Sequence, residues 1–100
     1  MNFQVRWKDC DRSKAVEAGV QDILTSLAKY SFINEDVKVE IVHYDKRNIF
    51  KARINVHVKG RNILRAEATA PTIYGAVKEA LDKLEDQLRR AKTKLRKGRK

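Results

Sequence analysis

The chain has 100 residues and is poor in the residues that cross-link, interrupt or anchor a protein. Its single cysteine, Cys10, excludes an internal disulfide framework and a zinc site built from several cysteines. Four glycines and one proline are too few for a low-complexity chain. Apolar runs are only a few residues long, so we expect no membrane segment. Residues 1–20 lack an apolar signal segment, so we expect one cytoplasmic domain.

Acidic residues are also scarce relative to basic ones. The chain has 23 Lys and Arg against 13 Asp and Glu, a formal charge of +10. From Arg89 onward there are eight basic residues and no acid, so residues 1–88 form a nearly neutral body. Charge concentrated at one end of a chain orients a polyanion, most simply a nucleic acid. The alternative is a basic tail that only keeps the protein in solution.

Apolar residues recur with the spacing of four strands and two helices. The pattern predicts strands at about 2–8, 37–44, 50–58 and 64–68, and helices at about 13–29 and 72–97. Ser13 and Thr72 are expected to cap the two helices, and Pro71 to stop the last strand. We therefore predict an α+β fold of order β-α-β-β-β-α. It has a four-stranded mixed sheet with two helices packed on one face, formed by residues 1–97, and a basic end at 98–100 that suits the start of a linker.

The outward positions of the predicted strands form a second basic surface. Among them seven are Lys or Arg and only two are acidic. Rows of basic side chains on an open sheet follow a phosphate backbone well, although a solvated sheet face often carries such residues too. The surface has no exposed aromatic pair for stacking on bases. The candidate RNA-binding residues on the strands and turns are Arg6, Lys8, Lys51, Arg53, Lys59 and Arg65.

The last predicted helix extends beyond the sheet, because its length exceeds that of the longest strand. Three of its bases follow an acid by four residues: Lys83 follows Glu79, Arg89 follows Glu85, and Arg90 follows Asp86. Such spacing predicts stabilising ion pairs along the helix. Four later bases have no such acid and are the most available ligands for phosphate. They are Lys92, Lys94, Arg96 and Lys97.

Residues for catalysis or metal binding are few. His43 and His57 are the only histidines, they fall on different predicted strands, and no cysteine is near either in sequence. No nucleophile has an evident base partner, and no phosphate-binding glycine loop is present. We therefore expect no enzyme activity, no metal, no cofactor and no small-molecule substrate.

Three segments resemble the ribosome hibernation promoting factor family, also called ribosome-associated inhibitor or protein Y. They are Leu64-Arg65-Ala66-Glu67, Ile73-Tyr74-Gly75-Ala76-Val77, and D-K-L-E-D-Q-L-R-R-A-K at residues 82–92. The element order matches as well, so the resemblance covers residues 1–97. The sequence departs from the family pattern at Pro71-Thr72, Lys78, Asp86 and Ala91.

The resemblance implies a translation inhibitor that needs no chemistry. Such proteins bind 16S rRNA in the mRNA and tRNA channel of the small ribosomal subunit and block translation by occupancy. Long members add a C-terminal domain that pairs ribosomes, so we expect dimerisation only if such a domain is present. The first helix offers only Lys14 and Lys29, which places the rRNA contacts mainly on the sheet and on Lys83, Arg89, Arg90 and Lys92.

Three other interpretations remain. The strand-strand-strand-helix portion resembles a double-stranded-RNA-binding domain, although residues 72–77 lack the lysines expected at the start of its last helix. An acylphosphatase-like enzyme fold needs a strand after the second helix, and residues 89–100 do not supply one. A structural partner domain without a ligand is the third.

Overall fold

The structure is a computed structural model that describes residues 1–60 and 62–97, with their side chains as far as Lys92. It confirms the α+β fold and the order of elements. These are β1 (Asn2–Lys8), α1 (Lys14–Leu24), the 3₁₀ helix η1 (Thr25–Lys29), β2 (Ile33–Tyr44), β3 (Ile49–Val58), β4 (Ile63–Ala70) and α2 (Ile73–Lys97).

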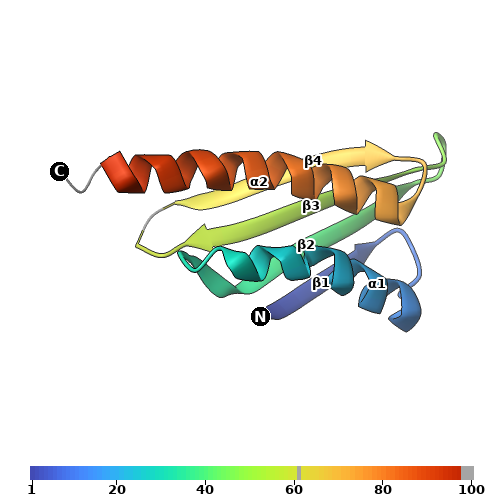
Figure 1. The fold of residues 1–100 in the computed structure, drawn as a ribbon. Coiled ribbons are helices and arrows are strands. Elements are labelled where there is room, and N and C mark those ends of the chain that lie inside the picture. The colour runs from blue at the N-terminus through green and yellow to red at the C-terminus, as the bar shows by residue number, and fades with distance from the viewer. Residues whose placement is uncertain (61, 98–100) are drawn as a thin grey trace.

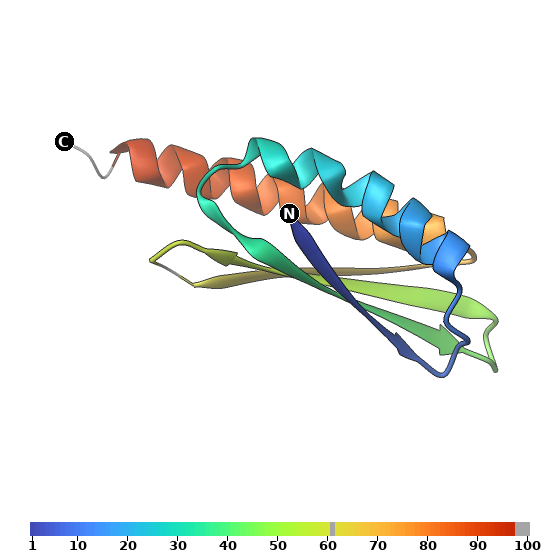
Figure 2. The same ribbon diagram turned by 90° about the horizontal axis from the view of Figure 1, so that it is seen from below.

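The four strands form one mixed sheet in the order β1-β2-β3-β4. β1 and β2 are parallel because α1 and η1 cross over between them, whereas the short β2–β3 and β3–β4 connections make the other pairs antiparallel. The two connections use left-handed backbone at Asn48 (φ 50°) and Gly60 (φ 70°). Figure 2 shows the sheet as one layer and the helices as a second layer on one of its faces.

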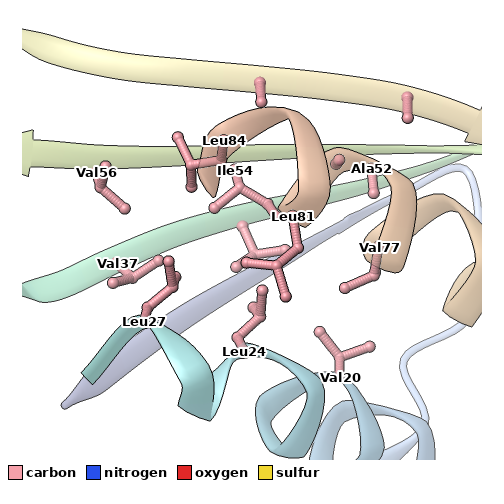
Figure 3. Packing of buried hydrophobic residues seen from close by; sticks show 14 of the residues in the cluster. Val20, Leu24, Leu27, Val37, Ala52, Ile54, Val56, Val77, Leu81 and Leu84 are labelled. Carbon is pink, nitrogen blue, oxygen red and sulfur yellow. The ribbon is translucent and has the colours of Figure 1, made fainter. Parts of the chain in front are cut away.

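The core lies between the helices and this sheet face. Val20 and Leu24 of α1 and Leu27 of η1 point toward the sheet and have no exposed surface (Figure 3). α2 contributes Val77 and Leu84, also fully buried, as its apolar stripe predicted. Both helices cover the same face, so the other face, here called the open face, has no helix over it in the described part of the chain (Figures 1 and 2).

Both predicted helix caps are confirmed. The Ser13 hydroxyl accepts a hydrogen bond from the Val16 amide at 3.3 Å, and the Thr72 hydroxyl accepts one from the Gly75 amide at 3.0 Å. Each satisfies an amide that the first helical turn leaves without an intrahelical partner. Pro71 ends β4 as expected, and α2 starts two residues later.

The predicted single helix over residues 13–29 is wrong in its last turns. The chain tightens into η1 at Thr25, whose backbone amide and hydroxyl both donate to the Asp22 carbonyl, the hydroxyl at 2.6 Å. Bonding three residues back favours the 3₁₀ geometry over the α-helix. β2 also begins earlier than predicted, at Ile33, because an irregularity between Ile33 and Val37 breaks the alternation that marked the strand.

Candidate nucleic-acid interface

The C-terminal half of α2 holds the concentrated positive charge. Arg89, Arg90 and Lys92 are exposed on this helix. Lys94, Arg96 and Lys97 belong to the same helix, and their side chains lie outside the described residues. The 25 residues of α2 give a helix about 37 Å long, and its last turns extend past the end of the sheet, as predicted (Figure 1). The basic run is therefore presented on a projecting helix.

Two candidate cations on the open face are already paired with carboxylates. Arg53 Nε donates to Glu67 Oε2 at 3.0 Å, and its Nη1 lies 3.8 Å from Glu40 Oε1. Lys51 Nζ lies 3.2 Å from Glu67 Oε2. Hydrogen bonds from Arg53 and then Lys51 hold the pKa of Glu67 below its ordinary value. The register aligns Arg6, Glu40, Arg53 and Glu67 across the four strands, which we call the ion-pair row.

The other candidate cations of the sheet and its turns lie in different surroundings. Arg6, Lys8 and Lys59 are exposed, and none has an ion pair among the residues that the structure describes. Arg65 Nε donates to the amide oxygen of Asn55 at 2.8 Å, which positions its guanidinium without neutralising it. Of the candidate cations on the sheet and its turns, Lys51 and Arg53 are therefore paired with acids, whereas Arg6, Lys8, Lys59 and Arg65 keep uncompensated charge.

Glu85 connects α2 to η1 and to the start of the following segment. Its carboxylate accepts hydrogen bonds from the Ser26 hydroxyl at 3.0 Å and the Tyr30 hydroxyl at 3.2 Å. It also lies 3.3 Å from Lys29 Nζ and 3.9 Å from Arg89 Nη1. Burial raises the pKa of this carboxyl, but the hydrogen bonds from Ser26, Lys29 and Tyr30 outweigh that effect and lower the pKa below its ordinary value.

Because Glu85 holds η1 against α2, Lys29 of η1 lies beside the basic half of α2. Lys29 Nζ lies 5.3 Å from the centre of the Tyr30 ring as well as beside Glu85, and its side chain is largely exposed. The scarcity of basic residues in residues 13–29 predicted little contribution from this part of the chain. The contact joins residues more than 50 positions apart, so only the packing of η1 against α2 reveals it.

Two predicted ion pairs of α2 are wrong. Lys83 Nζ donates to the Glu67 carbonyl of β4 at 3.3 Å instead of pairing with Glu79. Asp86 pairs with Arg89, three residues on, instead of with Arg90. The pair between Glu85 and Arg89 is confirmed. Gln87 also donates to a β4 carbonyl, that of Arg65, at 2.9 Å. Together Lys83 and Gln87 satisfy carbonyls on the edge strand, which carries no further strand in the described fold.

No metal site is evident in the described residues, since none of their His, Cys, Asp and Glu side chains gather in groups of three or more. His43 stacks on Phe50 and lies 2.8 Å from Asp45, at the β2–β3 turn. Burial raises the pKa of the Cys10 thiol, which is the opposite of what a reactive cysteine requires. No helix in the described part of the chain is long and apolar enough to cross a membrane.

A nearly neutral sheet domain with its excess charge on one projecting helix is the kind of domain that docks on a polyanion. Residues 3–96 match the family described as Sigma 54 modulation protein / S30EA ribosomal protein. The chain belongs to this family.

Similar proteins agree with the assignment. A ribosome hibernation promotion factor of Lactococcus lactis subsp. cremoris (strain MG1363) is 29% identical over 99 residues, which are 95% of this chain and 51% of that protein. The chain thus spans about half the length of this curated relative. The Protein Y N-terminal domain of Thermus thermophilus superposes with a TM-score of 0.76 at 26% identity, over 90% of this chain and 98% of that one. A ribosomal subunit interface protein from Coxiella burnetii has the same fold, with a TM-score of 0.77 at 21% identity over 93% and 99%.

Proposed function

We propose that residues 1–97 bind the small ribosomal subunit through 16S rRNA, in the channel for mRNA and tRNA, and inhibit translation by occupying it. The observation that carries the proposal is the basic run from Arg89, which lies on a helix projecting beyond the sheet in a member of a ribosome-associated family. Occupancy requires only binding, which agrees with a role as a cytoplasmic binding factor rather than an enzyme.

The proposed contacts with rRNA come from three regions of the molecule: the C-terminal half of α2, η1 beside it, and the open face of the sheet with its turns. The basic half of α2 supplies the largest share, the uncompensated sheet cations extend it, and Lys29 of η1 adds a small share because it already pairs with Glu85. Lys51 and Arg53 take a smaller part because both pair with Glu67 and Arg53 also lies near Glu40. Residues 98–100 lie outside the described residues, and we propose them as the start of a linker. Pairing of ribosomes would need a further domain.

The test is a sucrose-gradient profile of ribosomal subunits with and without the protein, together with translation in an extract. We expect co-sedimentation with the small subunit and reduced translation. Migration away from the subunits at low salt, with translation unaffected, would refute the proposal.

A double-stranded-RNA-binding module that is not specific to ribosomes is the alternative. A perfect RNA duplex added in excess distinguishes the two functions. Ribosome binding should survive this competition if the rRNA channel is the target, whereas a general duplex binder would be displaced.

A further inference from the structure

A groove crosses β1 and β2 on the open face of the sheet. Its volume is about 350 Å³, and its polar lining comes from Gln4, Arg6, Lys38, Glu40 and Asn55. Two of these side chains are amides, two are cations and one is a carboxylate. Small-ligand sites are usually lined mainly by apolar side chains, with a few convergent polar groups that orient the ligand. This groove is lined mainly by polar and charged residues, which suits a polar ligand. Its mixture of donors and acceptors differs from the purely cationic end of α2.

The groove lies where two contrasting rows of side chains meet. One is the ion-pair row, which contributes Arg6 and Glu40 to the groove. The next row across the sheet aligns Gln4, Lys38, Asn55 and Arg65 and contains no acid. Diagonal neighbours on adjacent strands, such as Glu40 and Asn55, lie about 7–8 Å apart, which a ligand of the size of a nucleobase spans, so groups from both rows reach one bound ligand.

The hydrogen bond between Arg65 and Asn55 fixes which way the Asn55 amide faces. A guanidinium N–H is accepted only by the amide oxygen, which lies 2.8 Å from Arg65 Nε. The Asn55 amide nitrogen therefore keeps its donors for a ligand. Glu40 is diagonally adjacent, and its only ion pair among the described residues is the long 3.8 Å contact to Arg53. A donor thus stands beside a carboxylate acceptor at the groove.

This pattern fits one nucleobase better than the others. The Watson–Crick edge of guanine presents the acceptor O6 followed by the donors N1–H and N2–H₂. A carboxylate accepts both donors, and an amide N–H reaches O6. Uracil places a second acceptor, O2, where guanine has N2–H₂, and a carboxylate repels that atom. The groove lining contains no aromatic side chain, so recognition rests on the base edge rather than on stacking.

We propose that this groove binds one unpaired guanosine nucleotide of RNA. Glu40 accepts from N1–H and N2–H₂, Asn55 donates to O6, and Arg6 and Lys38 hold the flanking phosphates. The proposal rests on the proposed function only in that RNA is the ligand. It deepens that function by adding base selectivity to a surface whose other contacts are to phosphate.

The test uses two fluorescent oligouridylates of equal length, one of which carries a single central guanosine. Fluorescence anisotropy should show that the wild type binds the guanosine oligomer about tenfold more tightly, the discrimination of one good bidentate base contact. Glu40→Gln and Asn55→Ala should each reduce this preference to about twofold or less. Arg6→Gln should weaken binding of both oligomers alike. Thr69→Ala, a change on the same face at β4, is the matched control and should keep the preference.

A second measurement needs no variant. Guanosine 5′-monophosphate added to ¹⁵N-labelled protein should shift the side-chain amide signals of Asn55 and Gln4 and leave the Thr69 backbone amide in place, whereas uridine 5′-monophosphate should shift them less. Equal binding of the two oligomers, no binding of either, or a preference that survives in both groove variants would overturn the proposal. Ribosome co-sedimentation of the same preparations tests the proposed function separately, because base preference and subunit binding can each fail alone.

Discussion

The open face of the sheet and the C-terminal half of α2 are both rich in basic residues, yet they use them differently. On the sheet, Glu67 pairs with both Lys51 and Arg53, and Glu40 lies 3.8 Å from Arg53, so two acids face these two bases. On α2, Glu85 and Asp86 engage Arg89, and the sequence beyond that residue contains no acid at all. Counting bases therefore overstates what the sheet offers to a phosphate backbone. The charge available to a polyanion is that left over after internal pairing.

The largest expected effect comes from removing four charges at the end of α2. Replacing Lys92, Lys94, Arg96 and Lys97 by Gln should weaken binding to small ribosomal subunits roughly a hundredfold at moderate salt, since each lost phosphate contact also loses the release of counterions. Filter binding or sedimentation measures the affinity, and circular dichroism checks that the fold persists.

The matched control removes equal charge from the opposite end of the molecule and from its turns. Replacing Lys14, Lys46, Arg47 and Lys78 by Gln should lower the affinity only a few-fold, through the reduced net charge. Equal losses from the two sets of four would mean that total charge matters and that its position on α2 does not.

The next effect concerns how α2 is held against η1. Glu85→Ala leaves the hydroxyls of Ser26 and Tyr30 without their acceptor, so we expect the free energy of unfolding to fall by about 1–3 kcal/mol. Urea denaturation at neutral pH measures the loss. A value indistinguishable from that of the wild type would show that the Glu85 contacts do not hold the two helices together.

The same carboxylate predicts a dependence on pH. Because the pKa of Glu85 is lowered in the folded state, its contribution to stability is complete above the ordinary pKa and is lost as pH falls through the folded value. The wild type should therefore lose more unfolding free energy between about pH 5 and pH 3 than Glu85→Gln does. Parallel curves for the two proteins would contradict the lowered pKa.

Within the sheet, two double variants compare uncompensated with paired cations. Arg6→Gln with Lys8→Gln should reduce the affinity for the small subunit about fivefold, because two available charges are lost. Lys51→Gln with Arg53→Gln should reduce it only about twofold, because Glu67 pairs with both of these cations and Glu40 lies near Arg53. The reverse order would mean that Glu67 releases its partners when RNA binds.

The smallest expected effect is at Lys29. Lys29→Gln should lower the affinity about twofold at most, since Lys29 is exposed but already pairs with Glu85, and the Glu85 hydrogen bonds to Ser26 and Tyr30 remain. Competition between wild type and variant for a limiting amount of subunits resolves so small a difference. An unchanged affinity would show that η1 has a structural role only and makes no contact with the ribosome.

The fold was predictable wherever a repeating pattern extends over several residues. The alternation from Phe3 to Trp7 and the stripe from Val77 to Leu88 specify an element and its buried face, and the structure agrees. The start of β2 was not predictable, because residues 34–36 are all polar and exposed where the strand is irregular. The change from α1 to η1 at Thr25 was not predictable either. It depends on a hydrogen bond from the Thr25 hydroxyl to the Asp22 carbonyl, and the spacing of apolar residues carries no information about such a bond.

The candidate site was predictable in its local part only. The basic run on α2 is visible in the sequence, whereas the pairing of Arg53 with Glu67 depends on strand register. That register could have been predicted from the short β3–β4 connection, because the length of a hairpin loop fixes which residues of the two strands lie opposite each other. The contact between Lys29 and Glu85 had no such signal, since it arises from packing between distant segments.

The most direct test of the central claim is the salt dependence of binding to the small subunit between about 50 and 200 mM salt. We predict a steep linear fall of log affinity with log salt for the wild type, and a slope about three units shallower for the variant that lacks the four bases of α2. The control variant altered at the other end should keep most of the wild-type slope. A shallow slope for the wild type, or the same slope for all three proteins, would show that the basic half of α2 is not the surface that meets the ribosome.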